Sequence, residues 1–179
     1  MHLKEHYVKN ALPHLQEKLG CKNRHAIPRL LKVVVNVGLG NVVRDDSTRN
    51  KTKESLEQIT GQKPAITRAR NSIAGFNIRE GLIVGNKITL RGTRMYDFIT
   101  KVIHVVLPRV RDFQGLAPSS LDTSGNLTIG FKENTIFPEI PPEQSSVPHG
   151  LEVTCVTSAK TREEAFELFK ALQFPFKKE

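Results

Sequence analysis

Residues 29–37 read RLLKVVVNV, a β-branched run that is typical of a strand. Alternate side chains of a strand share a face, so this stretch predicts one apolar face and one partly polar face. The apolar face comprises Leu31, Val33, Val35 and Val37, and the other face comprises Lys32, Val34 and Asn36. The pattern therefore favours a sheet that is packed on one side and open on the other.

The stretch LIVGNKITLR at 82–91 predicts a second strand of the same kind. Ile88 and Leu90 should share its apolar face, and Lys87, Thr89 and Arg91 should share the other. Neither polar face contains an acidic residue. This favours a ligand-binding face, and a merely solvated face is the alternative.

Helical patterns interleave with strands along the rest of the chain. Pro13 interrupts the first helix and Pro108 ends the third, while Thr161 and Glu164 form a capping box that opens the last. The further elements expected are helices at 2–19, 93–107 and after 161, a polar loop running into a helix at 45–60, and strands at 126–131 and 150–157. This succession predicts an α+β fold with helices packed on one face of the sheet.

The length of 179 residues fits one domain, 1–179. Four prolines in FPEIPPEQSSVPH predict an extended loop at 137–149. No apolar run approaches the length of a membrane span, and the N-terminus resembles neither a signal nor a transit peptide. Cys21 and Cys155 form no paired motif, which indicates free thiols and a reducing compartment.

The net charge of +9 is unevenly distributed along the chain. Residues 61–111 contain 10 Lys and Arg against only Glu80 and Asp97, whereas residues 112–179 contain 6 against 10 acids. A polyanion-binding site concentrates positive charge in one part of the chain, whereas a generally basic surface spreads it along the chain.

No catalytic or cofactor motif is complete. GLGNVV at 38–43 has Val43 where a dinucleotide fingerprint needs glycine, and GLIVGNK at 81–87 is too short for a phosphate loop. His2 and His6 lack a third ligand at metal-binding spacing. Carboxylates are scarcest where the charge is highest, the reverse of a nuclease metal site. We expect no enzyme, cofactor or metal site.

The remaining signal is a set of basic side chains mixed with amides and hydroxyls in TGQKPAITRAR at 60–70. Lys and Arg neutralise phosphates, and Thr, Gln and Asn add hydrogen bonds that set the register. Phe76, Tyr96 and Phe98 are the aromatic residues of the basic third, and so small a number disfavours a base-stacking platform. Recognition of a folded RNA by shape and backbone fits best, although composition does not exclude DNA.

Seven segments together resemble the bacterial-type large-subunit ribosomal protein five family, which binds 5S rRNA. They occur in order over essentially the whole chain: VNVGLG at 35–40, TGQKPAITRAR at 60–70, SIAGFNIREG at 72–81, KITLRGTRMYDF at 87–98, LPRVRDFQGL at 107–116, IFPEI at 136–140 and FPF at 174–176. The resemblance implies an antiparallel sheet with helices on one side, and 5S rRNA near its exposed face and neighbouring loops.

The resemblance also implies the site residues. Asn36, Gln62 and Thr89 match family positions that touch 5S rRNA. The full 5S rRNA-binding set expected is Asn36, Gly38, Gly40, Gln62, Lys63, Thr67, Arg68, Arg70, Lys87, Thr89 and Arg91. The stretch 71–81 would be a long loop facing the elbow of the peptidyl-site tRNA, with Ser72, Ile73, Gly75, Phe76, Asn77, Arg79 and Gly81. Gly75 and Gly81 would let its backbone turn.

The implied partners are 5S rRNA, large-subunit rRNA, peptidyl-site tRNA, other 5S rRNA-associated ribosomal proteins and the small-subunit head protein thirteen. No membrane is expected. The implied location is the ribosome in the cytoplasm, or in an organelle that makes this protein itself. Asn71 and Asn77 stand where the family usually has lysine, and TSGNL at 123–127 replaces a turn that usually contains arginine.

Two other classes of function stay open. An RNA-modifying enzyme would need a cofactor pocket or a cluster of carboxylates and histidines. A free regulatory RNA or DNA binder would keep its affinity for RNAs other than 5S rRNA.

Overall fold

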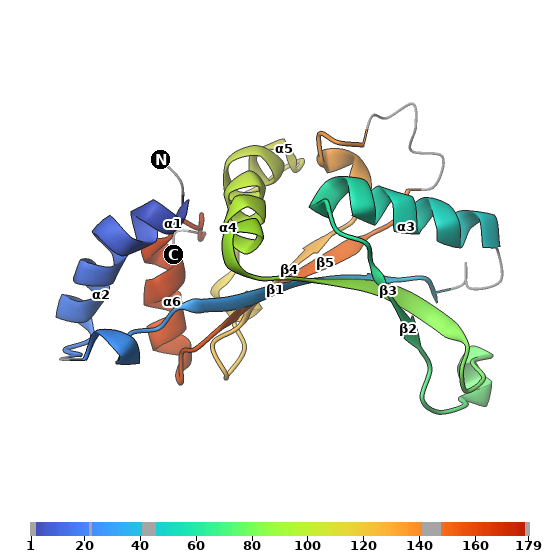
Figure 1. Cartoon of the computed structure of the whole chain (residues 1–179), viewed down its shortest axis with the longest axis horizontal. Coiled ribbons are helices and arrows are strands. Elements are labelled where there is room, and N and C mark those ends of the chain that lie inside the picture. The colour runs from blue at the N-terminus through green and yellow to red at the C-terminus, as the bar shows by residue number, and fades with distance from the viewer. Residues whose placement is uncertain (1–2, 22, 41–45, 141–147, 178–179) are drawn as a thin grey trace. The chain divides into compact units, whose positions relative to one another are not determined.

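The computed structural model describes residues 3–21, 23–40, 46–140 and 148–177. Its five strands form one antiparallel sheet in the order β2-β3-β1-β5-β4, which confirms the α+β fold (Figure 1). The strands are β1 (Leu30–Gly38), β2 (Ala65–Arg68), β3 (Ile83–Leu90), β4 (Leu127–Phe131) and β5 (Leu151–Thr157). The main helical elements are α1 (Leu3–His6), η1 (Tyr7–Ala11), α2 (Leu12–Lys18), α3 (Asp46–Thr60), α4 (Gly92–Lys101), η5 (Val102–Val106), α5 (Leu107–Arg109) and α6 (Arg162–Ala171).

The chain divides into two compact units. Unit 1 comprises Met1–Val34, Leu90–Ile129 and Val153–Glu179, and unit 2 comprises Val35–Thr89 and Gly130–Glu152. In unit 1, α6 packs against η1 and α2, and α1 packs against α4, around fully buried residues that include Leu15 and Phe169. In unit 2, α3 lies over the sheet and buries Leu56 and Ile59 (Figure 1). Each unit therefore has an apolar core of its own.

The register between β1 and β3 explains which side chains are buried. The amide of Leu39 donates to the carbonyl of Val84 at 3.0 Å, which places these two residues opposite each other. Counting back along the antiparallel strands pairs Val37 with Asn86. The same count pairs Val35 with Ile88, and all four of these side chains are buried. The apolar faces predicted for the two strands thus coincide on one side of the sheet.

The predicted alternation is wrong at the start of β1. Leu31 is 43% exposed, and Leu30 is buried in its place. A strand twists along its length, so the first residues of β1 need not keep the parity of those further along it. The alternation holds from Val33 onward.

Strand β2 was not expected, because four residues with exposed, basic character give too short an alternating pattern. It pairs antiparallel with β3 in a register that sets Ala65 opposite Lys87 and Thr67 opposite Gly85. A bulge between Thr67 and Arg68 shifts the pairing. As an edge strand, β2 is barely covered, and its Ile66 is 49% exposed.

The first helix continues through Pro13, which corrects the expectation that this proline would interrupt it. The helix that contains Pro108 ends one residue later, at Arg109, close to the expected end. Each proline follows a π-helical segment, η1 or η5. The residue before each proline donates to the carbonyl five positions back: Leu12 to Tyr7 and Leu107 to Val102. The wider turn makes room for a ring that would clash with the carbonyl four residues back.

Two more expectations were tested at helix starts. Within the polar stretch at 45–60, helix α3 begins at Asp46. It buries Thr52 and Ser55 as well as its apolar residues. The predicted cap at Thr161 is confirmed, since its Oγ1 accepts from the amide of Glu164 at 3.3 Å. The return bond of a capping box is shifted by one residue, because the Glu164 carboxylate accepts from the amide of Lys160 at 2.9 Å. Within the expected proline-rich loop 137–149, residues 141–147 lie outside the described residues.

We predict that Gly85→Ala destabilises the protein by about 1–3 kcal/mol, a typical cost of overpacking. A Cβ atom at this position would lie 2.7 Å from the Val37 carbonyl oxygen, which is backbone and cannot swing away. Urea unfolding measures the change. Gly38→Ala is the matched control, because no atom lies within 4 Å of a Cβ there. Equal stability of the two variants would contradict the close approach of β1 and β3.

Candidate nucleic-acid interface

The open face of the sheet in unit 2 carries polar side chains on neighbouring strands. Asn36 on β1 is half-buried, and the register sets it opposite the exposed Lys87 on β3. Thr89 lies two residues further along β3 and is also half-buried. Because side chains at i and i+2 share a face, Asn36, Lys87 and Thr89 lie on the same side of the sheet. The sequence-based placement of these residues agrees with this arrangement.

Gln62 follows the end of α3 and lies beside β3. The left-handed Gly61, with φ +65°, ends the helix, and the Gln62 amide then donates to the Thr60 hydroxyl at 3.3 Å. The Gln62 side-chain amide in turn donates to the Thr89 carbonyl at 3.4 Å. The helix end therefore holds Gln62 beside Thr89, although 27 residues separate them in sequence.

Thr67 adds an unsatisfied hydroxyl to the same side of the sheet. It lies opposite Gly85 and two residues from Ala65, which pairs with Lys87. Its Oγ1 is shielded from solvent and has no hydrogen-bond partner among the described residues. An unpaired buried hydroxyl costs free energy, and no protein group among the described residues offsets that cost at Thr67.

Exposed cations and two glycines surround these neutral donors. None of the cations forms an ion pair within the part of the chain that the structure describes, although Arg68 Nη1 donates to the Gly81 carbonyl at 3.0 Å. The exposed members in unit 2 are Gly38, Gly40, Lys63, Arg68, Arg70 and Lys87. Arg91 is exposed as well, but it belongs to unit 1. The residues of unit 2 can neutralise phosphates and donate hydrogen bonds to RNA groups.

The stretch 71–81 forms a small hairpin that extends from β2 and β3 (Figure 1). Ile73 and Ile78 pair with each other through two backbone hydrogen bonds of 2.9 and 3.1 Å. At its base Ser72 Oγ accepts from the Glu80 amide at 2.9 Å, and the Gly81 amide donates to the Ala69 carbonyl at 3.0 Å. The hairpin is thus held by backbone groups, and none of its side chains is buried.

The tip of this hairpin presents apolar side chains to solvent. Phe76 is 75% exposed and Ile73 is 47% exposed. Asn77, at φ +55°, makes the left-handed turn there, and Gly75 has no positive φ, contrary to the expected role of Gly75. Asn tolerates the left-handed region better than most residues, which gives this departure from the family pattern a conformational reason. Gly81, at φ +81°, turns the chain at the base.

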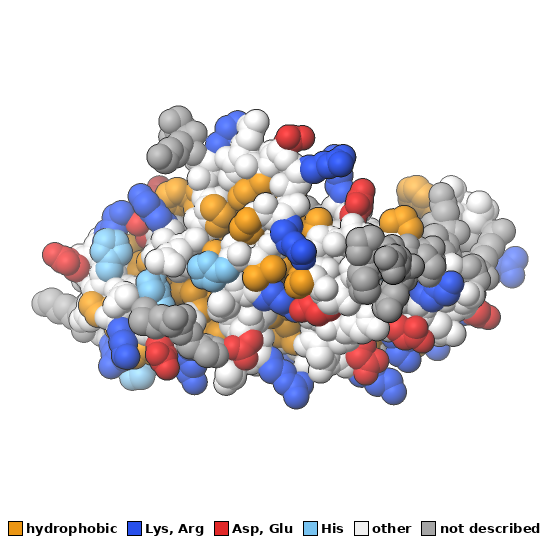
Figure 2. All heavy atoms as spheres, turned by 90° about the horizontal axis from the view of Figure 1, so that it is seen from above, with side chains coloured by type: hydrophobic (Ala, Val, Ile, Leu, Met, Phe, Trp, Pro, Cys, Tyr) orange, Lys and Arg blue, Asp and Glu red, His pale blue; other side chains and the backbone are white. Residues whose placement is uncertain are grey.

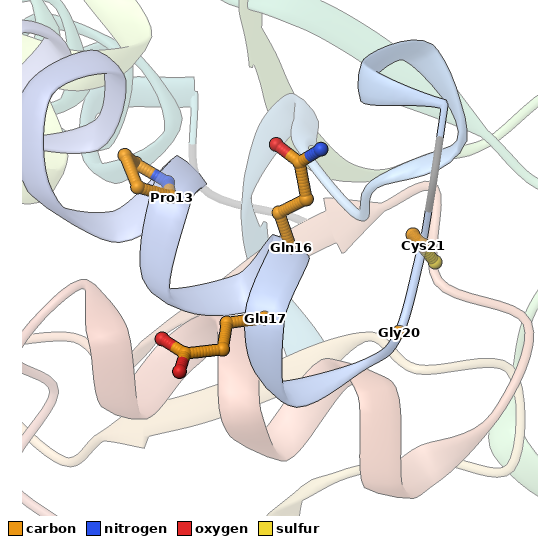
Figure 3. A pocket seen from close by; sticks show the side chains of 5 residues that line it. All are labelled: Pro13, Gln16, Glu17, Gly20 and Cys21. Atoms are coloured by element: carbon orange, nitrogen blue, oxygen red, sulfur yellow. The ribbon is translucent and has the colours of Figure 1, made fainter.

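Other surfaces of the protein have fewer features of a binding site than the polar face and the hairpin. Figure 2 looks down on the helices, where Lys, Arg, Asp and Glu side chains are interspersed. A shallow open hollow lies at the end of α2 and is lined by Pro13, Gln16, Glu17, Gly20 and Cys21 (Figure 3). Among the described residues, no three His, Cys, Asp or Glu side chains gather as metal ligands, and no helix is both long and apolar enough to cross a membrane.

Two family models together match most of the chain. Residues 23–79 match the model for ribosomal protein L5, and residues 83–176 match the model for the C-terminus of the same ribosomal protein family. The chain belongs to the L5 family of ribosomal proteins. This family is structural and not enzymatic, so the expected absence of catalysis agrees with the identity of the relatives.

Bacterial relatives match this chain over nearly its whole length, and each carries the name large ribosomal subunit protein uL5. The protein of Carboxydothermus hydrogenoformans is 46% identical over 97% of this chain and 97% of its own. The protein of Pseudothermotoga lettingae is 47% identical over 98% of this chain and 96% of its own. The protein of Halothermothrix orenii is 48% identical over 97% of this chain and 97% of its own. The chain is therefore a constituent of the large ribosomal subunit, and its partners include rRNA.

We predict that one thiol per native chain reacts with a disulfide reagent at pH 8. Burial raises the pKa of the Cys155 thiol to about 12, so it stays protonated and shielded until the pH approaches that value. Cys21 is only half-buried. The reagent's absorbance counts the thiols, and Cys21→Ser should abolish the native reaction. Two fast-reacting thiols in the native protein would contradict the burial of Cys155.

We predict that Ser72→Ala accelerates hydrogen exchange at the Glu80 amide by about fivefold, because that amide loses an acceptor worth about 1 kcal/mol. Amide exchange followed by NMR measures this. The Ile73 and Ile78 amides serve as the internal control, since their partners are backbone carbonyls. An unchanged rate at Glu80 would show that the hairpin base is not closed by this bond.

Proposed function

We propose that this chain binds 5S rRNA in the central protuberance through the open face of unit 2. The observation that carries the proposal is the set of neutral donors, Asn36, Gln62 and Thr89, held together on that face within a border of unpaired cations. Gln62 is fixed to the Thr89 backbone, so the set is ordered before RNA arrives. Preorganisation lowers the entropy cost of binding.

The two kinds of residue have different tasks in this proposal. The cations bind phosphates and release counterions, a contribution that depends on salt concentration and not on the nucleotide sequence. They are Lys63, Arg68, Arg70 and Lys87. The amides and hydroxyls, including the unpaired Thr67, fix the register of the RNA by hydrogen bonds. Because these polar groups are half-buried, a wrong RNA leaves them unsatisfied, and this gives specificity.

The hairpin 71–81 contacts the elbow of the peptidyl-site tRNA in the same proposal. Its exposed Phe76 and Ile73 suit nucleotide faces, and the exposed Arg79 suits a phosphate. The hairpin also lies close to the small-subunit head protein thirteen and helps to bridge the subunits. The relatives are bacterial, which supports a place on the cytoplasmic ribosome, beside the other 5S rRNA-associated proteins.

We predict that Asn36→Ala or Thr89→Ala weakens 5S rRNA binding by about 1–3 kcal/mol, because each leaves a partner group unpaired. Arg79→Ala should leave this binding nearly unchanged, since its contact is with tRNA. Titration of the purified protein with labelled 5S rRNA measures both. If Arg79→Ala weakened 5S rRNA binding as much as Asn36→Ala, the division between face and hairpin would be wrong.

The same titration separates the proposal from its alternatives when bulk tRNA and duplex DNA compete at two salt concentrations. Specific recognition predicts that 5S rRNA binding survives excess competitor and higher salt. Equal binding to all three nucleic acids, lost together as salt rises, would mean a generic basic surface.

A further inference from the structure

The hairpin 71–81 depends on its base for its direction relative to the sheet. None of its side chains is buried, so apolar packing does little to hold it (Figure 1). The bonds between Ile73 and Ile78, and between the Glu80 amide and Ser72 Oγ, lie within the hairpin. They fix its shape but not the direction in which it points. That direction is set where the hairpin joins β2 and β3.

The backbone at this junction is irregular. The bulge after Thr67 shifts the pairing, so that Arg68 lies opposite Ile83. Beyond the bulge, the Gly81 amide donates to the Ala69 carbonyl at 3.0 Å, and Gly81 itself has a φ of +81°. A bulge bends a strand locally, and a glycine at positive φ has no Cβ to restrict it. The junction is therefore a place where the hairpin could swing.

The side chain of Arg68 spans this junction. Its Nη1 donates to the Gly81 carbonyl at 3.0 Å, although 13 residues separate the two in sequence. A hydrogen bond from a charged donor is stronger than one between neutral groups. The bond holds the peptide group that follows the left-handed glycine, and so it joins the end of β2 to the far strand of the hairpin.

The same guanidinium has donors to spare. Arginine carries five N–H donors in one rigid plane, and the Gly81 carbonyl is bonded to Nη1. Arg68 is exposed, and no carboxylate among the described residues forms an ion pair with it. A guanidinium fixed at one edge by a carbonyl can bind an anionic group at another edge, and phosphate is the anion that suits its geometry.

We propose that Arg68 is a positioning residue for the hairpin 71–81 and couples its order to RNA binding. The guanidinium holds the Gly81 carbonyl through Nη1 and binds a phosphate of 5S rRNA through its other N–H groups. Both contacts restrict the same rigid side chain, so each favours the other, and linkage makes the effect reciprocal. The brace stands on the geometry of unit 2, whereas the coupling rests on the proposed 5S rRNA contact.

The brace is tested in the free protein, without RNA. Hydrogen exchange followed by NMR compares Arg68→Ala with Arg70→Ala, the matched control, which removes the same charge from another exposed position of the same stretch. We expect the Gly81 amide to exchange about fivefold faster in Arg68→Ala, because the junction opens more often. It should be unchanged in Arg70→Ala. The order parameters of residues 73–78 should fall in Arg68→Ala alone.

The coupling is tested with 5S rRNA at a concentration that saturates each variant. Exchange of the segment 71–81, followed by mass spectrometry, should slow about fivefold or more on RNA binding in the wild type and in Arg70→Ala. It should not slow in Arg68→Ala. Arg68→Lys keeps the charge and should restore the salt slope of RNA binding, but not the protection of the hairpin, because an ammonium lacks the planar fork. Thermal melting confirms that each variant is folded.

Four results would overturn the proposal. Exchange at Gly81 that is the same in free Arg68→Ala as in the wild type would remove the brace. Equal acceleration in Arg68→Ala and Arg70→Ala would show an effect of charge and not of the bond. Equal protection of the hairpin by RNA with and without the Arg68 side chain would remove the coupling. Full rescue by Arg68→Lys would show that the fork is not needed.

The proposed function and this inference fail in different ways. A wild-type chain that does not bind 5S rRNA would refute the function proposed for unit 2 and the coupling with it. The exchange of the free protein would still decide whether Arg68 holds the hairpin, because that measurement contains no RNA.

Discussion

The pairing of β1 with β3 is the constraint on which the rest of unit 2 depends. Gly85 brings the strands so close that a Cβ there would lie 2.7 Å from the Val37 carbonyl oxygen. The period of a strand is two residues, so a slip by one position would exchange the two faces of β3. Ile88 would then be exposed and Lys87 would be buried. The register therefore sets the apolar core and the polar face together.

The polar face illustrates how a binding surface can be specific without a pocket. Its cations are exposed to solvent, so salt weakens their electrostatic contribution. Its neutral donors are half-buried and are held by backbone contacts, as Gln62 is by Thr89. Affinity and specificity thus come from different residues.

The hairpin 71–81 shows how side chains can be presented to a partner from an ordered backbone. Backbone hydrogen bonds between Ile73 and Ile78, and the bond from the Glu80 amide to Ser72 Oγ, hold the hairpin together. No apolar side chain is needed for this, so Phe76 and Ile73 remain exposed at the tip.

The sequence by itself determined the α+β class, four of the five strands, the start of α6 at Thr161 and the family. These features rest on local patterns: β-branched alternation, a capping box and quoted motifs in order. It also put Asn36 and Thr89 on polar faces, because face parity follows from counting residues along one strand. Only the tertiary structure decided that β2 pairs with β3, that Gln62 reaches Thr89, and that the Thr67 hydroxyl has no partner among the described residues. The π-helical turns before Pro13 and Pro108 are of the same kind. The physical reason is that each depends on residues far apart in the chain or on the packing of a whole helix, and no local pattern encodes which distant groups will meet.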